Sequence, residues 1–207
     1  PVFEAGAKLA GAELSYYPLN AEHHFLPYVA GIDPIVADRA KYMIVSLPAN
    51  PVGSVGTPEL YEEIIAFARE HDLLIVHDNA YSDITYDGPR GGSFLSYPGA
   101  LQVGVEFFSL SKSFNVPGAR IGFLVGRADV VAAFSKLRSQ IDFGMFLPLQ
   151  KAAWHTRNVA MRSAPALSPW AGSVPTRMAP CSSGANCRAV ARTPWRSARS
   201  LWTRRVS

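Results

Sequence analysis

The sequence has few cysteines and no long hydrophobic run. Its 207 residues include only Cys181 and Cys187, whose spacing lacks the paired cysteines and histidines of a zinc site. No apolar run approaches the roughly 20 residues that a membrane helix needs, and no signal-peptide pattern opens the chain. These absences predict a cytoplasmic protein that has no membrane partner, no metal and no need of a disulfide.

Acidic residues are missing from the last quarter of the chain. All 16 of them lie in residues 1–153, whereas residues 154–207 hold nine arginines, no lysine and all four tryptophans. A basic arm for nucleic acid is one interpretation. Arginine without lysine or acid, with frequent proline, is also what a GC-rich gene yields when it is read out of frame. We therefore expect a frameshift near residue 154 and no nucleic-acid partner; a single intact frame at the locus would exclude the frameshift.

The first 153 residues alternate between helical and strand patterns. A helix is expected over 2–10, another begins at Thr57 and Pro58, and a third covers 128–141. Strands are expected over 12–17, 42–47, 73–76, 103–108 and 121–126. Strand, helix and strand with short connections make a βαβ unit. The sequence thus predicts an α/β fold with a doubly wound, mostly parallel sheet in 1–153, followed by a basic tail of low order in 154–207.

Polar residues follow directly on several of these expected strands. Asn50 follows the strand over 42–47, Asp78 and Tyr81 follow the next, and Ser109 to Lys112 follow the strand over 103–108. Singly, each has a structural explanation: a turn, a helix cap, a packed ring or a surface lysine. Because the carboxyl ends of parallel strands share one edge of the sheet, we expect these residues to converge on a ligand.

The residue types suggest what that ligand carries. The amine of Lys112, the hydroxyls of Ser109 and Ser111 and the guanidinium of Arg120 suit a molecule with an aldehyde and a phosphate. In order along the chain stand the motifs Asn50-Pro51-Val52-Gly53, Asp78-x-x-Tyr81, Ser109-x-Ser111-Lys112 and Gly118-x-Arg120-x-Gly122.

Over residues 1–153, these motifs resemble class I aminotransferases of pyridoxal-phosphate fold type I. The string from His77 to Lys112 is most similar to relatives that act on LL-diaminopimelate, alanine and aspartate. The resemblance implies transfer of an amino group from an amino acid to a 2-oxo acid, with pyridoxal 5'-phosphate as cofactor. It also implies a homodimer.

The resemblance assigns a role to each matching residue. Lys112 would bind the cofactor as a Schiff base and carry the proton at the α-carbon. Asp78 would face the pyridine nitrogen, and Asn50 and Tyr81 would hydrogen-bond the ring hydroxyl. The remaining three residues would hold the phosphate: Ser109, Ser111 and Arg120. His77 has no such role and is expected to pack in the core.

Parts of the family pattern lie outside this sequence. They include an aromatic residue that stacks on the ring and an arginine that binds the substrate carboxylate. Because the chain also begins at Pro1, we expect a fragment with impaired activity. A non-catalytic remnant, or a decarboxylase or carbon–sulfur lyase of the same fold, stays open, as does the amino donor. The aminotransferase-like half of a transcription regulator is disfavoured because no DNA-reading helix-turn-helix precedes the fold.

Overall fold

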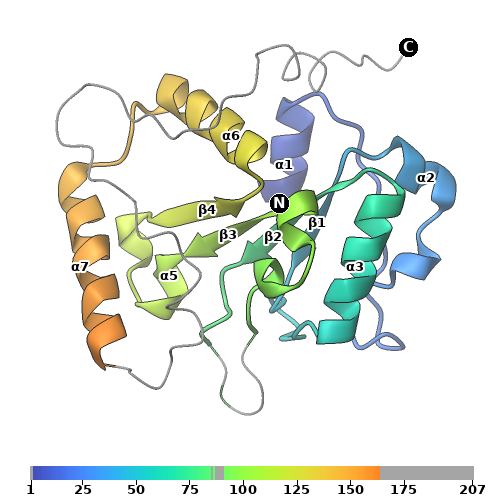
Figure 1. Ribbon diagram of the computed structural model, residues 1–207, viewed down its shortest axis with the longest axis horizontal. Helices are drawn as coiled ribbons and strands as arrows, with labels where there is room; N and C mark the ends of the chain where they lie inside the picture. Colours follow the sequence, from blue (N-terminus) through green and yellow to red (C-terminus); the bar gives the residue numbers. More distant parts are fainter. Residues whose placement is uncertain (1, 85, 87–90, 164–207) are drawn as a thin grey trace. The chain divides into compact units, whose positions relative to one another are not determined.

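The structure is a computed structural model that describes residues 2–84, 86 and 91–163 (Figure 1). Four strands form one sheet in the order β1-β2-β3-β4. Their bounds are β1 Tyr42–Ser46, β2 Leu74–Asn79, β3 Gly104–Ser109 and β4 Gly122–Gly126. β1, β2 and β3 run parallel, and β4 runs antiparallel to β3. The prediction of a mostly parallel α/β sheet is confirmed.

The direction of β4 follows from the segment that precedes it. Between β3 and β4 lie only the short helix α5 (Leu110–Ser113) and the turn η3 (Pro117–Ala119). This connection holds no helix long enough to cross the sheet, so the chain turns back beside β3. The amide of Leu110 donates to the carbonyl of Ile121 at 3.1 Å, which closes the turn.

Helix α3 (Pro58–Glu70) begins where the sequence places it. Thr57 is the N-cap, and its hydroxyl accepts from the amide of Leu60 at 3.3 Å. Pro58 occupies the first turn, where its missing amide hydrogen costs nothing. The buried side of α3 packs on the sheet and comprises Leu60, Tyr61, Ile64, Ile65 and Ala68.

The other helices are shorter or lie further along the chain. Upstream of the sheet lie α1 (Val2–Leu9), η1 (Val29–Gly31) and α2 (Pro34–Arg39). Between β2 and β3 lie η2 (Phe94–Ser96) and α4 (Ala100–Val103). After β4 come α6 (Ala128–Ile141) and α7 (Leu147–Ser163). The expected helices over 2–10 and 128–141 correspond to α1 and α6.

Helices cover both faces of the sheet. His77 of β2 contacts Tyr61 of α3, whereas Phe107 of β3 contacts Phe134 of α6, with ring centroids 5.6 Å and 5.8 Å apart. Because His77 is paired in register with Glu106, the residue before Phe107, these two contacts lie on opposite faces. Asp78 follows His77 and so belongs to the face opposite α3.

The expected strand over 12–17 is wrong. These residues form no strand in the described part of the chain, and none of them is fully buried. Tyr17 instead donates its hydroxyl to the carbonyl of Ile44 in β1 at 2.6 Å. Burial raises the pKa of Tyr17 to about 12, so the phenol keeps this proton. The carbonyl of Ile44 thus accepts from a side chain and not from a neighbouring strand.

The chain divides into two units, Pro1–Ser135 and Lys136–Ser207. Helix α7 continues to Ser163, past the tail boundary expected at residue 154. Residues 164–207, with both cysteines, lie outside the described residues, so the division at 153 stays a prediction. In the described part of the chain, none of the helices has the length and hydrophobicity needed to cross a membrane.

Candidate functional site

Three predicted site residues meet at the carboxyl edge of the sheet. Asn50 lies in the loop after β1, Tyr81 lies two residues beyond the end of β2, and Lys112 lies in α5 directly after β3. The side-chain amide of Asn50 donates to the Tyr81 hydroxyl at 3.0 Å. The Lys112 amine stands 5.6 Å from the centroid of the Tyr81 ring. The exposed amine therefore lies over an aromatic face whose hydroxyl is already oriented.

Asp78 occupies the end of β2 on the same edge. In register it pairs with Ser46 of β1 and with Phe107 of β3. Burial raises the pKa of the Asp78 carboxyl, and the neighbouring His77 and a hydrogen bond from Ser46 offset this only in part. A half-buried carboxylate of this kind is stabilised by a cationic partner.

Ser109 and Ser111 begin the short helix that carries Lys112. The Ser109 hydroxyl accepts from the amide of Ser111 at 3.2 Å, so Ser109 is the N-cap of α5. Both side chains are half-buried. The N-cap bond thus fixes the Ser109 hydroxyl at the strand end, and Ser111 lies beside it next to the lysine.

Arg120 is exposed and turned onto its own loop. Its backbone lies in the left-handed region, with φ of 53°, and its guanidinium donates to the carbonyl of Pro117 at 3.2 Å. The backbone bond from Leu110 to Ile121 brings the next residue to the start of α5. The structure therefore places Arg120 beside the end of β3 and directs its side chain along η3.

A contact that the sequence did not reveal connects two of the site loops. The Ser113 hydroxyl donates to the Asp83 carboxylate at 2.6 Å. Asp83 follows Tyr81 by two residues, and Ser113 follows Lys112 directly. The bond therefore holds the segment of the phenol against the segment of the amine. Neither residue stands in a pattern that announces this partner.

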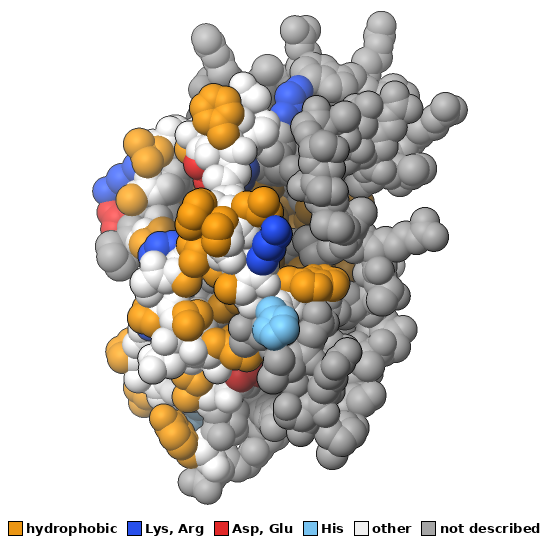
Figure 2. Space-filling view, turned by 90° about the vertical axis from the view of Figure 1, so that its left-hand side faces the viewer, with side chains coloured by type: hydrophobic (Ala, Val, Ile, Leu, Met, Phe, Trp, Pro, Cys, Tyr) orange, Lys and Arg blue, Asp and Glu red, His pale blue; other side chains and the backbone are white. Residues whose placement is uncertain are grey.

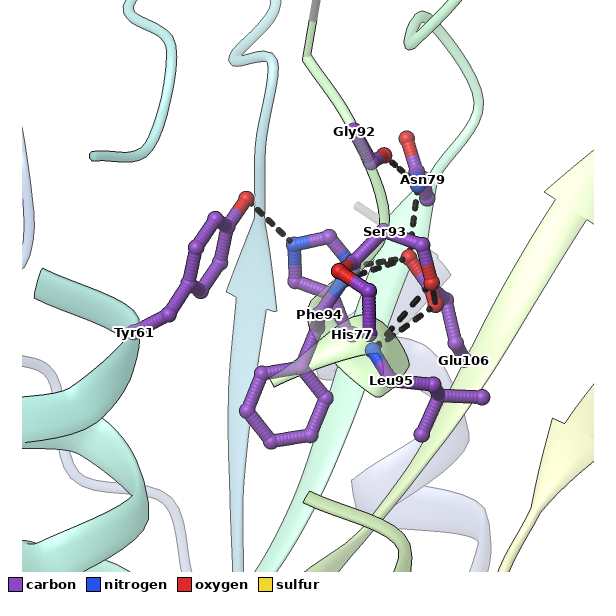
Figure 3. Close-up of polar contacts among 9 residues, drawn as sticks. Tyr61, His77, Asn79, Gly92, Ser93, Phe94, Leu95 and Glu106 are labelled. Atoms are coloured by element: carbon purple, nitrogen blue, oxygen red, sulfur yellow. Dashed lines mark hydrogen bonds and ion pairs between the residues drawn. The ribbon is translucent and has the colours of Figure 1, made fainter. Parts of the chain in front are cut away.

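Sequence reasoning also missed a buried polar cluster on the α3 face (Figure 3). His77 is packed in the core as expected, but its imidazole lies 3.0 Å from the carboxylate of Glu106. A charged residue within the apolar run of β3 was the available signal, since a buried carboxylate requires partners. No cluster of three or more histidine, cysteine or acidic side chains suited to a metal occurs in the described residues.

A family model described as aminotransferase class I and II matches residues 1–158. The LL-diaminopimelate aminotransferase of Moorella thermoacetica is 47% identical over 152 residues, which cover 73% of this chain and 39% of that protein. The enzyme of the same name from Syntrophobacter fumaroxidans is 45% identical, with the same shares covered. This chain thus spans about two fifths of the length of the curated relatives it matches.

Solved structures with the same fold agree. Substrate-bound BacF of Bacillus subtilis superposes with a TM-score of 0.71 at 38% identity, over 73% of this chain and 38% of that one. A mutant aspartate aminotransferase of Thermus thermophilus gives a TM-score of 0.69 at 25% identity, over 78% and 42% of the two chains.

Proposed function

The chain belongs to the class I and II aminotransferase family, and we propose that its sheet edge holds pyridoxal 5'-phosphate for the transfer of an amino group. The amino group would pass from an amino acid to a 2-oxo acid. The observation that carries this proposal is the position of the Lys112 amine over the Tyr81 ring, with the Tyr81 hydroxyl held by Asn50. An amine, a phenol, an amide and a carboxylate then lie at one edge of the sheet.

This set of side chains fits the groups of the cofactor. Pyridoxal phosphate supplies, when bound, an aldehyde and an aromatic ring that accepts the electrons of a bond broken at the α-carbon. The amine of Lys112 matches the aldehyde, and the carboxylate of Asp78 matches the ring nitrogen. Tyr81 and Asn50 match the ring hydroxyl.

In this arrangement Lys112 would bind the cofactor and would move the proton at the substrate α-carbon. The exposed Lys112 amine lies over the face of the Tyr81 ring, from which it would reach a substrate α-carbon. Asp78 would hold a proton at the ring nitrogen, because its half-buried carboxylate is costly without a cation beside it.

The phosphate would be held by Ser109, Ser111 and Arg120. The Ser109 hydroxyl is held at the start of α5, and the Arg120 guanidinium, which donates to the carbonyl of Pro117, would turn to a phosphate oxygen. A charged hydrogen bond to phosphate is stronger than one to a neutral carbonyl, so this exchange is favourable.

Substrates and partners follow from the family. LL-diaminopimelate is the first amino donor to test, because curated relatives up to 47% identical carry that name. A second copy of the chain is the proposed partner, and the cytoplasm is the proposed location. Neither nucleic acid nor a membrane is part of the proposal.

The test is the covalent attachment of the cofactor. We expect the full chain, titrated with pyridoxal phosphate, to develop a new absorbance band, and borohydride reduction to fix the cofactor on Lys112 in peptide mass spectra. Lys112→Ala should lose both signals, whereas Lys136→Ala should keep them as a matched control. An intact fold without any Lys112-dependent band would contradict the proposal and favour a non-catalytic remnant.

The cofactor-loaded protein also distinguishes an aminotransferase from a decarboxylase and a carbon–sulfur lyase. With LL-diaminopimelate added, an aminotransferase bleaches the band and releases a 2-oxo acid without carbon dioxide. A decarboxylase releases carbon dioxide, and a carbon–sulfur lyase requires a sulfur-containing substrate. Product analysis of one turnover therefore decides among the three.

A further inference from the structure

A cluster of five buried polar side chains lies on the face of the sheet opposite Asp78 (Figure 3). They come from α3, from β2, from β3 and from the residue before η2. At most 3% of any one of them is exposed. The members of this Glu106 cluster are Tyr61, His77, Asn79, Ser93 and Glu106.

The carboxylate of Glu106 is the centre of the cluster, as the dashed lines of Figure 3 show. Its neighbours supply five hydrogen-bond donors, enough to satisfy an ionised carboxylate. Three are side chains: His77 Nδ1 at 3.0 Å, Asn79 Nδ2 at 2.6 Å and the Ser93 hydroxyl. Two are backbone amides: Phe94 at 3.2 Å and Leu95 at 3.4 Å.

The imidazole of His77 is oriented from both sides. Burial, and next the negative charge of Glu106, raises the pKa of Tyr61, so its phenol remains protonated. The Tyr61 hydroxyl lies 3.4 Å from Nε2 of His77. Nδ1 faces the Glu106 carboxylate, which only accepts, and so carries the hydrogen of that bond.

Stability alone does not account for this cluster. A buried carboxylate loses several kcal/mol of hydration, and well-packed apolar residues are often as stabilising as a buried charged pair. The cluster does supply a fixed geometry, because it connects β2, β3 and the start of η2 around one group. Asn79 reinforces the connection by donating to the carbonyl of Gly92 at 2.8 Å.

The bonds of the Glu106 cluster lie at the same position along β2 as Asp78. His77 and Glu106 are partners in register, and Asp78 pairs with Phe107, the next residue of β3. Asp78 thus stands between His77 and Asn79, which are both bonded to Glu106. Its backbone is held from behind while its side chain reaches the site edge.

We propose that the Glu106 cluster is a positioning device that holds Asp78 against the ring nitrogen of the cofactor. The inference rests on the function proposed above. A functional carboxylate must be held within about 0.5 Å of its productive position by supporting hydrogen bonds. Glu106 is a positioning residue here, since it acts through Asp78 and lies on the other face of the sheet.

The test follows the proton on the ring nitrogen. The full chain is loaded with pyridoxal phosphate labelled with ¹⁵N in the ring, and the nitrogen chemical shift is recorded against pH. Glu106→Gln introduces an amide of nearly the same shape. Its NH₂ group would face the hydrogen-bond donors around residue 106, so part of the cluster's bonding is lost. The midpoint of nitrogen deprotonation should fall by about one pH unit, a tenfold weaker hold on the proton.

Two comparisons separate positioning from general loss of stability. Ile65→Ala removes buried methyl groups from α3 and should lower the melting temperature without moving the nitrogen midpoint. In an Asp78→Asn background, Glu106→Gln should produce no further shift, because its effect passes through Asp78. If Ile65→Ala also moves the midpoint, or if the two shifts add, the proposal is overturned.

A milder variant covers the case in which Glu106→Gln does not fold. Ser93→Ala removes one donor and leaves the other four, so a smaller shift in the same direction is expected. An unchanged midpoint in a folded variant with bound cofactor overturns this inference alone. A wild-type chain without a Lys112-dependent band overturns the proposed function as well, so the two failures are distinguishable.

Discussion

Asp78 and His77 are neighbours in β2 with very different surroundings, and the surroundings of Asp78 make the stability of the fold depend on pH. His77 is enclosed and bonded, whereas Asp78 is half-buried and its pKa is raised, chiefly by burial. A carboxyl whose pKa is higher in the folded chain than in the unfolded chain binds its proton more tightly when folded. Its contribution to stability is therefore present at low pH and is lost as the pH rises through the folded pKa.

We predict that Asp78→Asn removes this pH dependence in the cofactor-free protein. As the pH rises from about 3.8, the ordinary value for this group, the wild-type chain should lose stability that the variant keeps. Urea unfolding at several pH values above this one measures the difference. Asp33→Asn, at the exposed N-cap of α2, serves as a second carboxyl-to-amide substitution for comparison. Parallel profiles for wild type and Asp78→Asn would refute the argument.

At the scale of elements, helix α3 tests how local signals produce structure. Thr57→Ala removes the hydroxyl that accepts from the Leu60 amide, and about 1 kcal/mol of unfolding free energy should be lost. Thr57→Ser keeps the oxygen and should recover most of the loss. Chemical denaturation of the three proteins under one condition gives the comparison. A Thr57→Ala variant as stable as wild type would show that the cap is not needed.

The elements of the fold differ in how far the local sequence specifies them. Helix α3 was predictable because its cap, its proline and its apolar side are all local. The strand expected over 12–17 was wrong because alternation specifies a strand only where a neighbouring strand offers backbone partners. The reversed direction of β4 depends on the length of the segment that carries Lys112, and no periodicity in β4 encodes it.

The candidate site was predictable to a similar degree. Its residue types and the meeting of strand ends follow from the sequence, and the structure joins Asn50, Tyr81 and Lys112 at that edge. The orientation of Arg120 toward Pro117 was not predictable, since it depends on the left-handed backbone of one residue. The bond between Asp83 and Ser113 joins segments 30 residues apart, and no local pattern reports it.

At the scale of the whole molecule, exposed hydrophobic side chains determine how the chain behaves in solution. Within the unit 136–207, Phe143 is 94% exposed and Phe146 is 70% exposed. Leu137, Ile141 and Leu147 are also exposed in this unit. Figure 2 shows hydrophobic side chains, in orange, on the face of the molecule that it draws. Large exposed apolar side chains of this kind favour association between chains.

We therefore predict that the isolated chain self-associates. Sedimentation velocity over a range of concentrations should show species larger than a monomer. The double variant Phe143→Ser/Phe146→Ser should reduce them. Tyr16→Ser, at a residue 77% exposed in the other unit, should not. A wild-type chain that sediments as a monomer at every concentration would contradict the prediction.

The alternation along β2 also restricts how this stretch of chain can change in length. Removing one residue before His77 would rotate every later side chain to the other side of the sheet. Asp78 would then lie beside Glu106 in the buried cluster, placing two carboxylates together, while His77 would take the face of the candidate site. Substitutions in β2 destabilise the fold roughly in proportion to the change in side-chain size. A single-codon insertion or deletion there abolishes the candidate site and the Glu106 cluster at once.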